Sequence, residues 1–97
     1  MIGVFVSFTL SESFDAAAIR AIAKQARVKF EAMPGLRSKA FTLNEQERKA
    51  VNFYVWNNDA AARAFFTPEL AQRIGQLYGA TPAISFVEIA ELVDNAR

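Results

Sequence analysis

The residue types best suited to chemistry lie in one short segment, 51–56, whose side chains alternate as in a β-strand. One face of this segment is apolar, and the other consists of Asn52, Tyr54 and Trp56. Each of these three side chains combines small size or an apolar body with a hydrogen-bonding tip. An amide, a phenol and an indole in one row can orient a small ligand or donate to a developing oxyanion. This face therefore predicts a pocket with aromatic walls and a few fixed polar groups.

A preceding strand is expected to add cations to this face. Leu36–Leu43 predicts a second strand, joined by the polar loop Asn44–Lys49 to a third strand at Ala50–Trp56. If Leu43 pairs with Ala50, the facing pairs are Phe41 with Asn52, Lys39 with Tyr54, and Arg37 with Trp56. A register shifted by one residue would strand both cations on the apolar face. We therefore expect one surface carrying the catalytic candidates Asn52, Tyr54 and Trp56 and the substrate-binding candidates Arg37, Lys39 and Phe41.

Five further elements frame this hairpin. They are a strand Ile2–Leu10, a helix Phe14–Met33 with Ser13 as its N-cap, a short helix Ala60–Phe66, a helix from Pro68 that Gly79 ends, and a strand Ile84–Val93 before a short polar tail. The order β-α-β-β-α-α-β predicts an α+β, ferredoxin-like fold, a four-stranded antiparallel sheet with helices on one face. The other face then needs cover, which a second copy in a homodimer would supply.

Composition limits the possible functions. The 97 residues predict a single domain, 1–97, and 53% hydrophobic residues supply a core. A net charge of +1 argues against a nucleic-acid partner, and the absence of an apolar run of about 20 residues argues against a membrane. The absence of His excludes imidazole bases and removes the commonest transition-metal and haem ligand. The lack of Cys and of a leader pattern predicts a cytoplasmic location.

Several features together resemble a known superfamily. They are Pro34-Gly35-Leu36 before the second strand, Lys39 two residues before Phe41, Asn52-Phe-Tyr-Val-Trp56, and the helix-opening run from Asp59 to Phe65. In these features the chain resembles the dimeric α+β barrel superfamily over nearly its whole length. Within that superfamily it is most similar to YdhR-type monooxygenases, relatives of the antibiotic-biosynthesis monooxygenases.

The resemblance implies a homodimer whose sheets pack into a barrel, with one cleft per subunit between sheet and helices. It also implies oxidation of a small quinol- or anthrone-like aromatic substrate by O₂ without metal, flavin or haem. In such proteins an Asn and a Trp four positions apart line the cleft, and Asn52 and Trp56 have that spacing. By this analogy they hold the substrate oxygens or a peroxy intermediate, Lys39 or Arg37 stabilises the substrate anion, and Tyr54 relays a proton. The haem-degrading branch needs a His, which this chain lacks.

Other interpretations remain open at this stage. Asn52 could bond a helix end or a water, Trp56 could be ordinary packing, and the two cations could extend from an edge strand into water. A non-catalytic small-molecule-binding protein would use the same cleft. An isomerase or a lactone-processing enzyme would need a positioned base, for which Glu88 and a desolvated Lys39 are the candidates.

Overall fold

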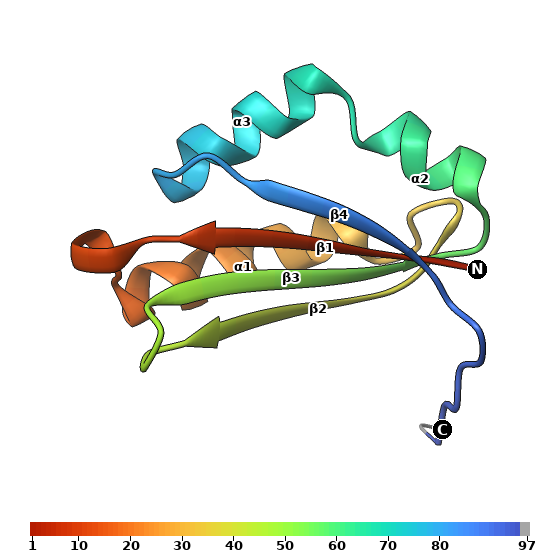
Figure 1. Cartoon of the computed structure of the whole chain (residues 1–97), viewed down its shortest axis with the longest axis horizontal. Helices are drawn as coiled ribbons and strands as arrows, with labels where there is room; N and C mark the ends of the chain where they lie inside the picture. The colour runs from red at the N-terminus through yellow and green to blue at the C-terminus, as the bar shows by residue number, and fades with distance from the viewer. Residues whose placement is uncertain (96–97) are drawn as a thin grey trace.

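The centre of the molecule is a four-stranded antiparallel sheet, as the sequence predicts. In the computed structural model, which describes residues 1–95, the strand order is β2-β3-β1-β4 (Figure 1). The strands are β1 (Ile2–Thr9), β2 (Leu36–Asn44), β3 (Lys49–Trp56) and β4 (Ala83–Glu88). The loop of β2 and β3 is tied by the side chain of Asn44, whose Oδ1 accepts from the Glu47 N–H at 3.0 Å.

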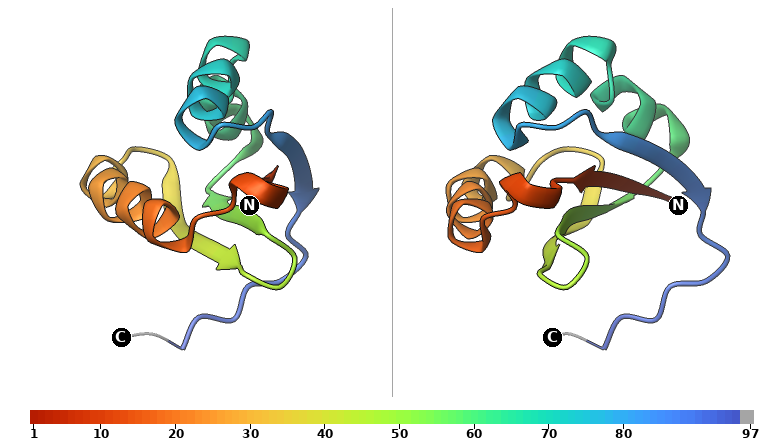
Figure 2. Two further views of the ribbon diagram at one scale, coloured as in Figure 1. Left: turned by 90° about the vertical axis from the view of Figure 1, so that its left-hand side faces the viewer. Right: turned by 60° about the vertical axis from the view of Figure 1, so that its left-hand side comes forward.

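Three α-helices lie on the same side of this sheet (Figure 2). They are α1 (Ala16–Phe30), α2 (Asp59–Phe65) and α3 (Pro68–Tyr78). Asn58 and Thr67 cap α2 and α3 by accepting from the backbone N–H groups of Ala61 and Leu70, and Gly79 ends α3 in the left-handed conformation. The predicted ferredoxin-like α+β order is confirmed. Within residues 1–95, no helix is long and apolar enough to cross a membrane.

The predicted boundaries of the first helix are wrong at both ends. α1 begins at Ala16, and its cap is Asp15, whose Oδ1 accepts from the Ala18 N–H at 3.1 Å. Ser13 instead belongs to a 3₁₀ turn, Ser11–Ser13, and its hydroxyl donates to the Leu10 carbonyl at 2.7 Å. The helix ends at Phe30 and not at Met33, because the backbone turns to an extended conformation at Glu31.

The last strand is shorter than predicted. β4 stops at Glu88, and the segment up to Val93 is not part of the sheet. The cause is the length of its neighbour: Glu88 pairs with Ile2, the first residue of β1, and one further bond joins the Ile89 N–H to the Met1 carbonyl at 3.2 Å. The predicted polar tail follows, and its last two residues, Ala96 and Arg97, lie outside the described residues.

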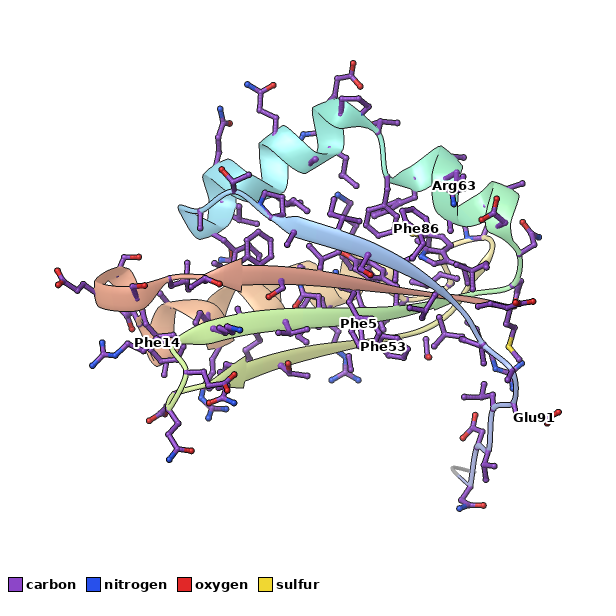
Figure 3. All side chains as sticks on the ribbon, in the orientation of Figure 1. Phe5, Phe14, Phe53, Arg63, Phe86 and Glu91 are labelled. Atoms are coloured by element: carbon purple, nitrogen blue, oxygen red, sulfur yellow. The ribbon has the colours of Figure 1, made fainter. Side chains whose placement is uncertain are left out.

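The core lies between the sheet and the helices. Val4, Val6 and Phe8 of β1 are fully buried there, together with the large rings of β3. The opposite, open face carries Phe5 and Phe53, whose ring centroids are 4.5 Å apart (Figure 3). Phe5 is 41% exposed. The alternation of the strands therefore places one apolar set in the core and leaves another without cover.

Candidate functional site

The hydrogen-bonding row of β3 lies under the helices. Asn52, Tyr54 and Trp56 are 4%, 2% and 1% exposed, and they share the helix side of the sheet with Val4 and Val6 of β1. The predicted face is thus correct: this row points away from the open side of the sheet. Burying an amide and an indole is costly unless their polar atoms find partners, so the surroundings of each decide its role.

The predicted hairpin register is confirmed for three pairs and wrong for the fourth. Leu43 faces Ala50, Phe41 faces Asn52, and Lys39 faces Tyr54. Trp56, however, faces Leu36 and not Arg37, because the pairing shifts by one residue between Leu36 and Ser38. Arg37 is the extra residue of this bulge, and it is exposed.

The bulge is explained by the tight entry into β2. Gly35 has a φ of +82°, and its carbonyl accepts from the Asn57 N–H at 2.9 Å, which ties the start of β2 to the end of β3. A Cβ at this glycine would come within 2.9 Å of the Ala61 Cβ, so α2 approaches this turn closely. Leu36 then packs against the core, and Arg37 is directed outward.

A small cavity of about 70 Å³ lies between the sheet, α1 and α3. Its wall combines apolar side chains with two amines, an amide and two phenols. The lining residues are Ile22, Ala26, Lys29, Phe30, Lys39, Asn52, Tyr54, Phe65, Leu70, Ile74, Leu77 and Tyr78. Apolar walls with few polar groups are typical of small-molecule sites, although pockets for drug-sized ligands measure about 300–1,000 Å³.

Lys39 is the more buried of the two lysines at this cavity, and aromatic rings surround its amine. The Nζ atom lies 3.5 Å from the ring centroid of Phe30, 4.1 Å from that of Phe41 and 4.3 Å from that of Tyr54. Burial, and to a smaller extent the positive charge of Lys29, lowers the pKa of Lys39 to about 7. Near neutral pH this side chain is therefore available both as a cation and as a neutral amine.

Asn52 and the two tyrosines supply the polar groups of the cavity. Asn52 Nδ2 donates to the Tyr78 hydroxyl at 3.2 Å, and Asn52 Oδ1 is buried without a hydrogen-bond partner among residues 1–95. Burial raises the pKa of Tyr54 and of Tyr78, so both phenols stay protonated at neutral pH and can donate. A free amide oxygen beside two phenol donors is a set of groups that can hold a polar ligand.

Trp56 lies outside this cavity, in an aromatic cluster at the other end of the row. Its ring is 5.1 Å from Phe65, 6.1 Å from Phe66 and 6.1 Å from Tyr54, centroid to centroid. The indole Nε1 is buried, and within the described part of the chain nothing accepts its hydrogen. Because Phe65 lines the cavity and also contacts Trp56, a ligand in the cavity meets Phe65 before it meets the indole.

The remaining sequence candidates are placed as follows. Phe41 contacts Phe30 edge-to-face at 6.0 Å and borders the amine of Lys39 without lining the cavity. Arg37 lies in an outer groove of about 260 Å³, which also has Lys39 and Phe30 in its wall. Glu88 is exposed at the end of β4 and is not part of the cavity wall. Of the two candidate bases, only Lys39 reaches the cavity.

Other hollows lack comparable chemistry. The largest, about 550 Å³, is an open depression along α3 and the turn after it, lined by Ala71, Gln72, Gly75, Gln76, Gly79, Ala80, Thr81 and Pro82. None of these side chains titrates. Within residues 1–95, no group of three or more His, Cys, Asp or Glu side chains is arranged to hold a metal ion.

Tyr78 is a site residue that the sequence argument missed. The sequence shows it only as the last member of the apolar stripe of α3, after Leu70, Ile74 and Leu77. In the structure its ring stacks on Phe8 at 4.0 Å, and its hydroxyl reaches Asn52. A tyrosine at the end of an apolar helical stripe can indicate a polar contact in the core, because a buried phenol usually finds a hydrogen-bond partner.

Comparison with solved structures shows a consistent fold. ActVA-Orf6, a monooxygenase of Streptomyces coelicolor in complex with nanaomycin D, is 18% identical, with a TM-score of 0.66 over 98% of this chain and 92% of that one. SnoaB, a cofactor-independent oxygenase from Streptomyces nogalater, is also 18% identical, with a TM-score of 0.66 over 95% of both chains. A third structure, an antibiotic biosynthesis monooxygenase, is 12% identical, with a TM-score of 0.63 over 94% of this chain and 100% of that one.

These similarities establish the fold. The chain has the ferredoxin-like α+β fold that these solved structures share, as the sequence predicts. Membership of the dimeric α+β barrel superfamily and the YdhR-type subdivision stay predictions. No protein-family model matches the sequence, and no curated protein matches it either.

Proposed function

We propose that this protein is a cofactor-independent monooxygenase that oxidises a small quinol- or anthrone-like substrate with O₂ in the cavity beside Lys39. The observation that carries the proposal is the composition of the cavity wall. The amine of Lys39, with a pKa of about 7, one amide and two phenols line this space, together with Lys29 and apolar side chains. Two structural neighbours with the same fold are a monooxygenase and a cofactor-independent oxygenase, which supports the reaction class.

The proposed reaction begins with a proton transfer. The neutral amine of Lys39 accepts the acidic proton of the substrate, and the resulting ammonium remains beside the delocalised anion. The anion passes one electron to O₂, and the two radicals combine to form a carbon–oxygen bond. Loss of water from the peroxide leaves a carbonyl, so that one substrate molecule and one O₂ give a quinone-type product and one H₂O.

Each polar neighbour has a place in this scheme. Tyr54 and Tyr78 donate to the developing oxyanion or to the peroxide, and Asn52 fixes the Tyr78 hydroxyl that it contacts. The aromatic wall excludes water, which strengthens these interactions. We keep a supporting role for Trp56, whose free indole N–H becomes available to a peroxide only when Phe65 moves aside. Arg37 and Phe41 border the outer groove, through which the substrate would enter.

The cavity volume favours the smaller substrates. About 70 Å³ is well below the size of a pocket for a three-ring anthrone. A larger substrate would require α3 to move outward at Leu77, which lines the cavity and is 56% exposed. We therefore place single-ring hydroquinones ahead of anthrones.

The function is tested by O₂ consumption with a panel of hydroquinones and anthrones in the presence of EDTA and without flavin. We expect turnover above the rate of autoxidation, and one ¹⁸O atom from ¹⁸O₂ in the product. Lys39→Met should lower kcat by about 10²–10⁴-fold, whereas Lys24→Met, an exposed lysine of α1, should leave it unchanged. Ligand-dependent fluorescence of Trp56 without any oxidised product would instead identify a non-catalytic binding protein.

We also propose that the open face of the sheet is the contact of a homodimer. Its residues include Gly3, Phe5, Ser7, Ser38, Ala40, Thr42, Val51, Phe53, Val55, Ala83, Ser85 and Val87, and the charged Lys49 lies at one end, at the start of β3. Phe5 and Val87 are 41% and 37% exposed. A surface with exposed apolar side chains and one charge at its end supports association with a second copy.

A further inference from the structure

Lys39 differs from the other lysines of the chain. Lys24 and Lys29 are exposed on α1, and the Lys49 Nζ lies 4.0 Å from a carboxylate oxygen of Glu47. Lys39 is half-buried, and no carboxylate among residues 1–95 lies within ion-pair distance of its amine. An amine that is desolvated and lacks a counter-ion favours its neutral, nucleophilic form.

Lys39 also lines two neighbouring spaces. It and Phe30 belong both to the wall of the cavity and to the wall of the outer groove beside Arg37, whereas Asn52 and Tyr54 line only the cavity. A small molecule in either space therefore lies against the Lys39 side chain.

We propose that Lys39 is a covalent carbonyl-capture site, at which its amine forms a reversible imine with small aldehydes that enter from the groove. The nitrogen lone pair attacks the aldehyde carbon, and the carbonyl oxygen takes up a proton to give a carbinolamine. Loss of that oxygen as water leaves the C=N bond. The net change is amine plus aldehyde to imine plus one water, with no oxidant or reductant involved.

The cavity provides what this step needs. The carbinolamine oxygen requires a donor, and the hydroxyls of Tyr54 and Tyr78 share the cavity with the Lys39 amine. The unpartnered Oδ1 of Asn52 can accept a hydrogen bond from the carbinolamine hydroxyl. Apolar side chains complete the wall, so the aldehyde's hydrocarbon part is held away from water.

The charge state of Lys39 depends on groups from several elements. Burial disfavours the ammonium most, and repulsion from Lys29 acts in the same direction, whereas the rings of Phe30, Phe41 and Tyr54 attract it. The titratable and charged groups around the amine or in its two spaces are Arg27 and Lys29 from α1, Glu31 after it, Arg37 from β2, Tyr54 from β3 and Tyr78 from α3. At pH 7 a lysine with a pKa of about 7 is about half neutral, against roughly one part in 2,500 for an ordinary exposed lysine.

This inference does not rest on the proposed oxygenase function. Imine formation needs no O₂, so it is measured under nitrogen, where oxygenation is absent. Labelling of Lys39 in a protein that consumes no O₂ would support imine formation alone. O₂ consumption by a protein whose Lys39 is not labelled would support the oxygenase alone.

The test is reductive trapping of the wild-type protein with benzaldehyde and sodium cyanoborohydride under nitrogen, from pH 6 to 9. Peptide mapping by mass spectrometry separates the reduced adducts on Lys39, Lys24 and the Met1 α-amino group. We expect Lys39 to react at least tenfold faster than Lys24 at pH 7, and its rate to level off above pH 7 while that of Lys24 keeps rising. Lys39→Arg should abolish the fast adduct, and Lys24→Arg should leave it unchanged.

The wild-type comparison needs no variant and so does not depend on whether Lys39→Arg folds. A Lys39-to-Lys24 rate ratio of ten or more at pH 7 supports the proposal. A smaller ratio, including no adduct on Lys39, overturns it.

Discussion

The two faces of the sheet are built from alternating residues of the same strands, yet they differ in kind. The helix face combines buried rings with two amines, an amide and two phenols around a cavity. The open face combines Phe5, Phe53 and Val87 with mostly small side chains and has no helix above it. The difference teaches that the amide and the phenols of this fold gather where the helices leave a cavity over the sheet. The open face needs an apolar partner instead.

The helix face itself divides into two ends. At one end, Trp56 is surrounded by Phe65 and Phe66, and Arg63 of α2 lies 4.3 Å from the ring centroid of Phe86 on β4 (Figure 3). At the other end, Lys39, Asn52 and the two tyrosines surround the cavity. The first end is an aromatic core, and the second contains the cavity in which we propose the reaction.

The largest effect is expected at the aromatic end. Trp56→Ala should lower the free energy of unfolding by about 3–5 kcal/mol, because a fully buried indole leaves a large void. Urea denaturation measures this loss. Val28→Ala, at a position 72% exposed on α1, is the control and should change stability by no more than about 0.5 kcal/mol. A loss below about 1 kcal/mol for Trp56→Ala would mean that this end is not a packed core.

A comparable change on the open face should act on association. Phe53→Glu places a charge in the proposed dimer contact and should weaken self-association by at least about a hundredfold, or about 2.7 kcal/mol. Sedimentation velocity over a concentration series measures this shift, with Val28→Glu as the surface control. Wild-type protein that stays monomeric at tens of micromolar would refute the dimer.

The third effect is a pH dependence that originates at the cavity. The pKa of Lys39 falls from 10.5 in the unfolded chain to about 7 in the fold, so between these values the unfolded state binds more protons. The free energy of unfolding should therefore rise with pH, by about 1–2 kcal/mol between pH 7 and 9. Below pH 7, Lys39 should contribute no pH dependence. Urea denaturation at each pH measures the slope, which Lys39→Met should remove and Lys24→Met should keep. An equal slope in Lys39→Met would assign it to another group.

A smaller effect is expected from the contact between Asn52 and Tyr78. Tyr78→Phe keeps the ring that stacks on Phe8 and removes the hydroxyl, so the amide of Asn52 loses its partner. We expect a loss of about 1 kcal/mol in urea denaturation, the usual cost of an unpaired buried group. The double variant with Asn52→Leu should recover part of that loss. Strict additivity of the two changes would show that the residues are not coupled.

The sequence was sufficient for the fold and for the side of the sheet on which β3 carries its polar row. Strict alternation decides which residues share a face, and a wrong register would have put Lys39 among valines. Both features are local or pairwise, so a single sequence contains them.

The burial and the neighbours of each side chain could not be predicted from the sequence. Arg37 left its predicted position because Gly35 forms a tight turn against α2, a contact between segments distant in sequence. Trp56 is separated from the cavity by Phe65, which depends on how α2 docks. Tyr78 joins the site only because α3 crosses β3 at Asn52. Each of these outcomes depends on tertiary packing, which periodicity does not encode.

The most direct test of the account is the titration of Lys39 itself. Proteins labelled with ¹³C at the lysine Cε give one NMR signal for each of the four lysines, and Lys39→Arg assigns the signal of interest. The account predicts a midpoint near pH 7 for Lys39. A midpoint near 10 for Lys39 would leave the cavity without a neutral amine, and would contradict both its role as a base and its role as a nucleophile.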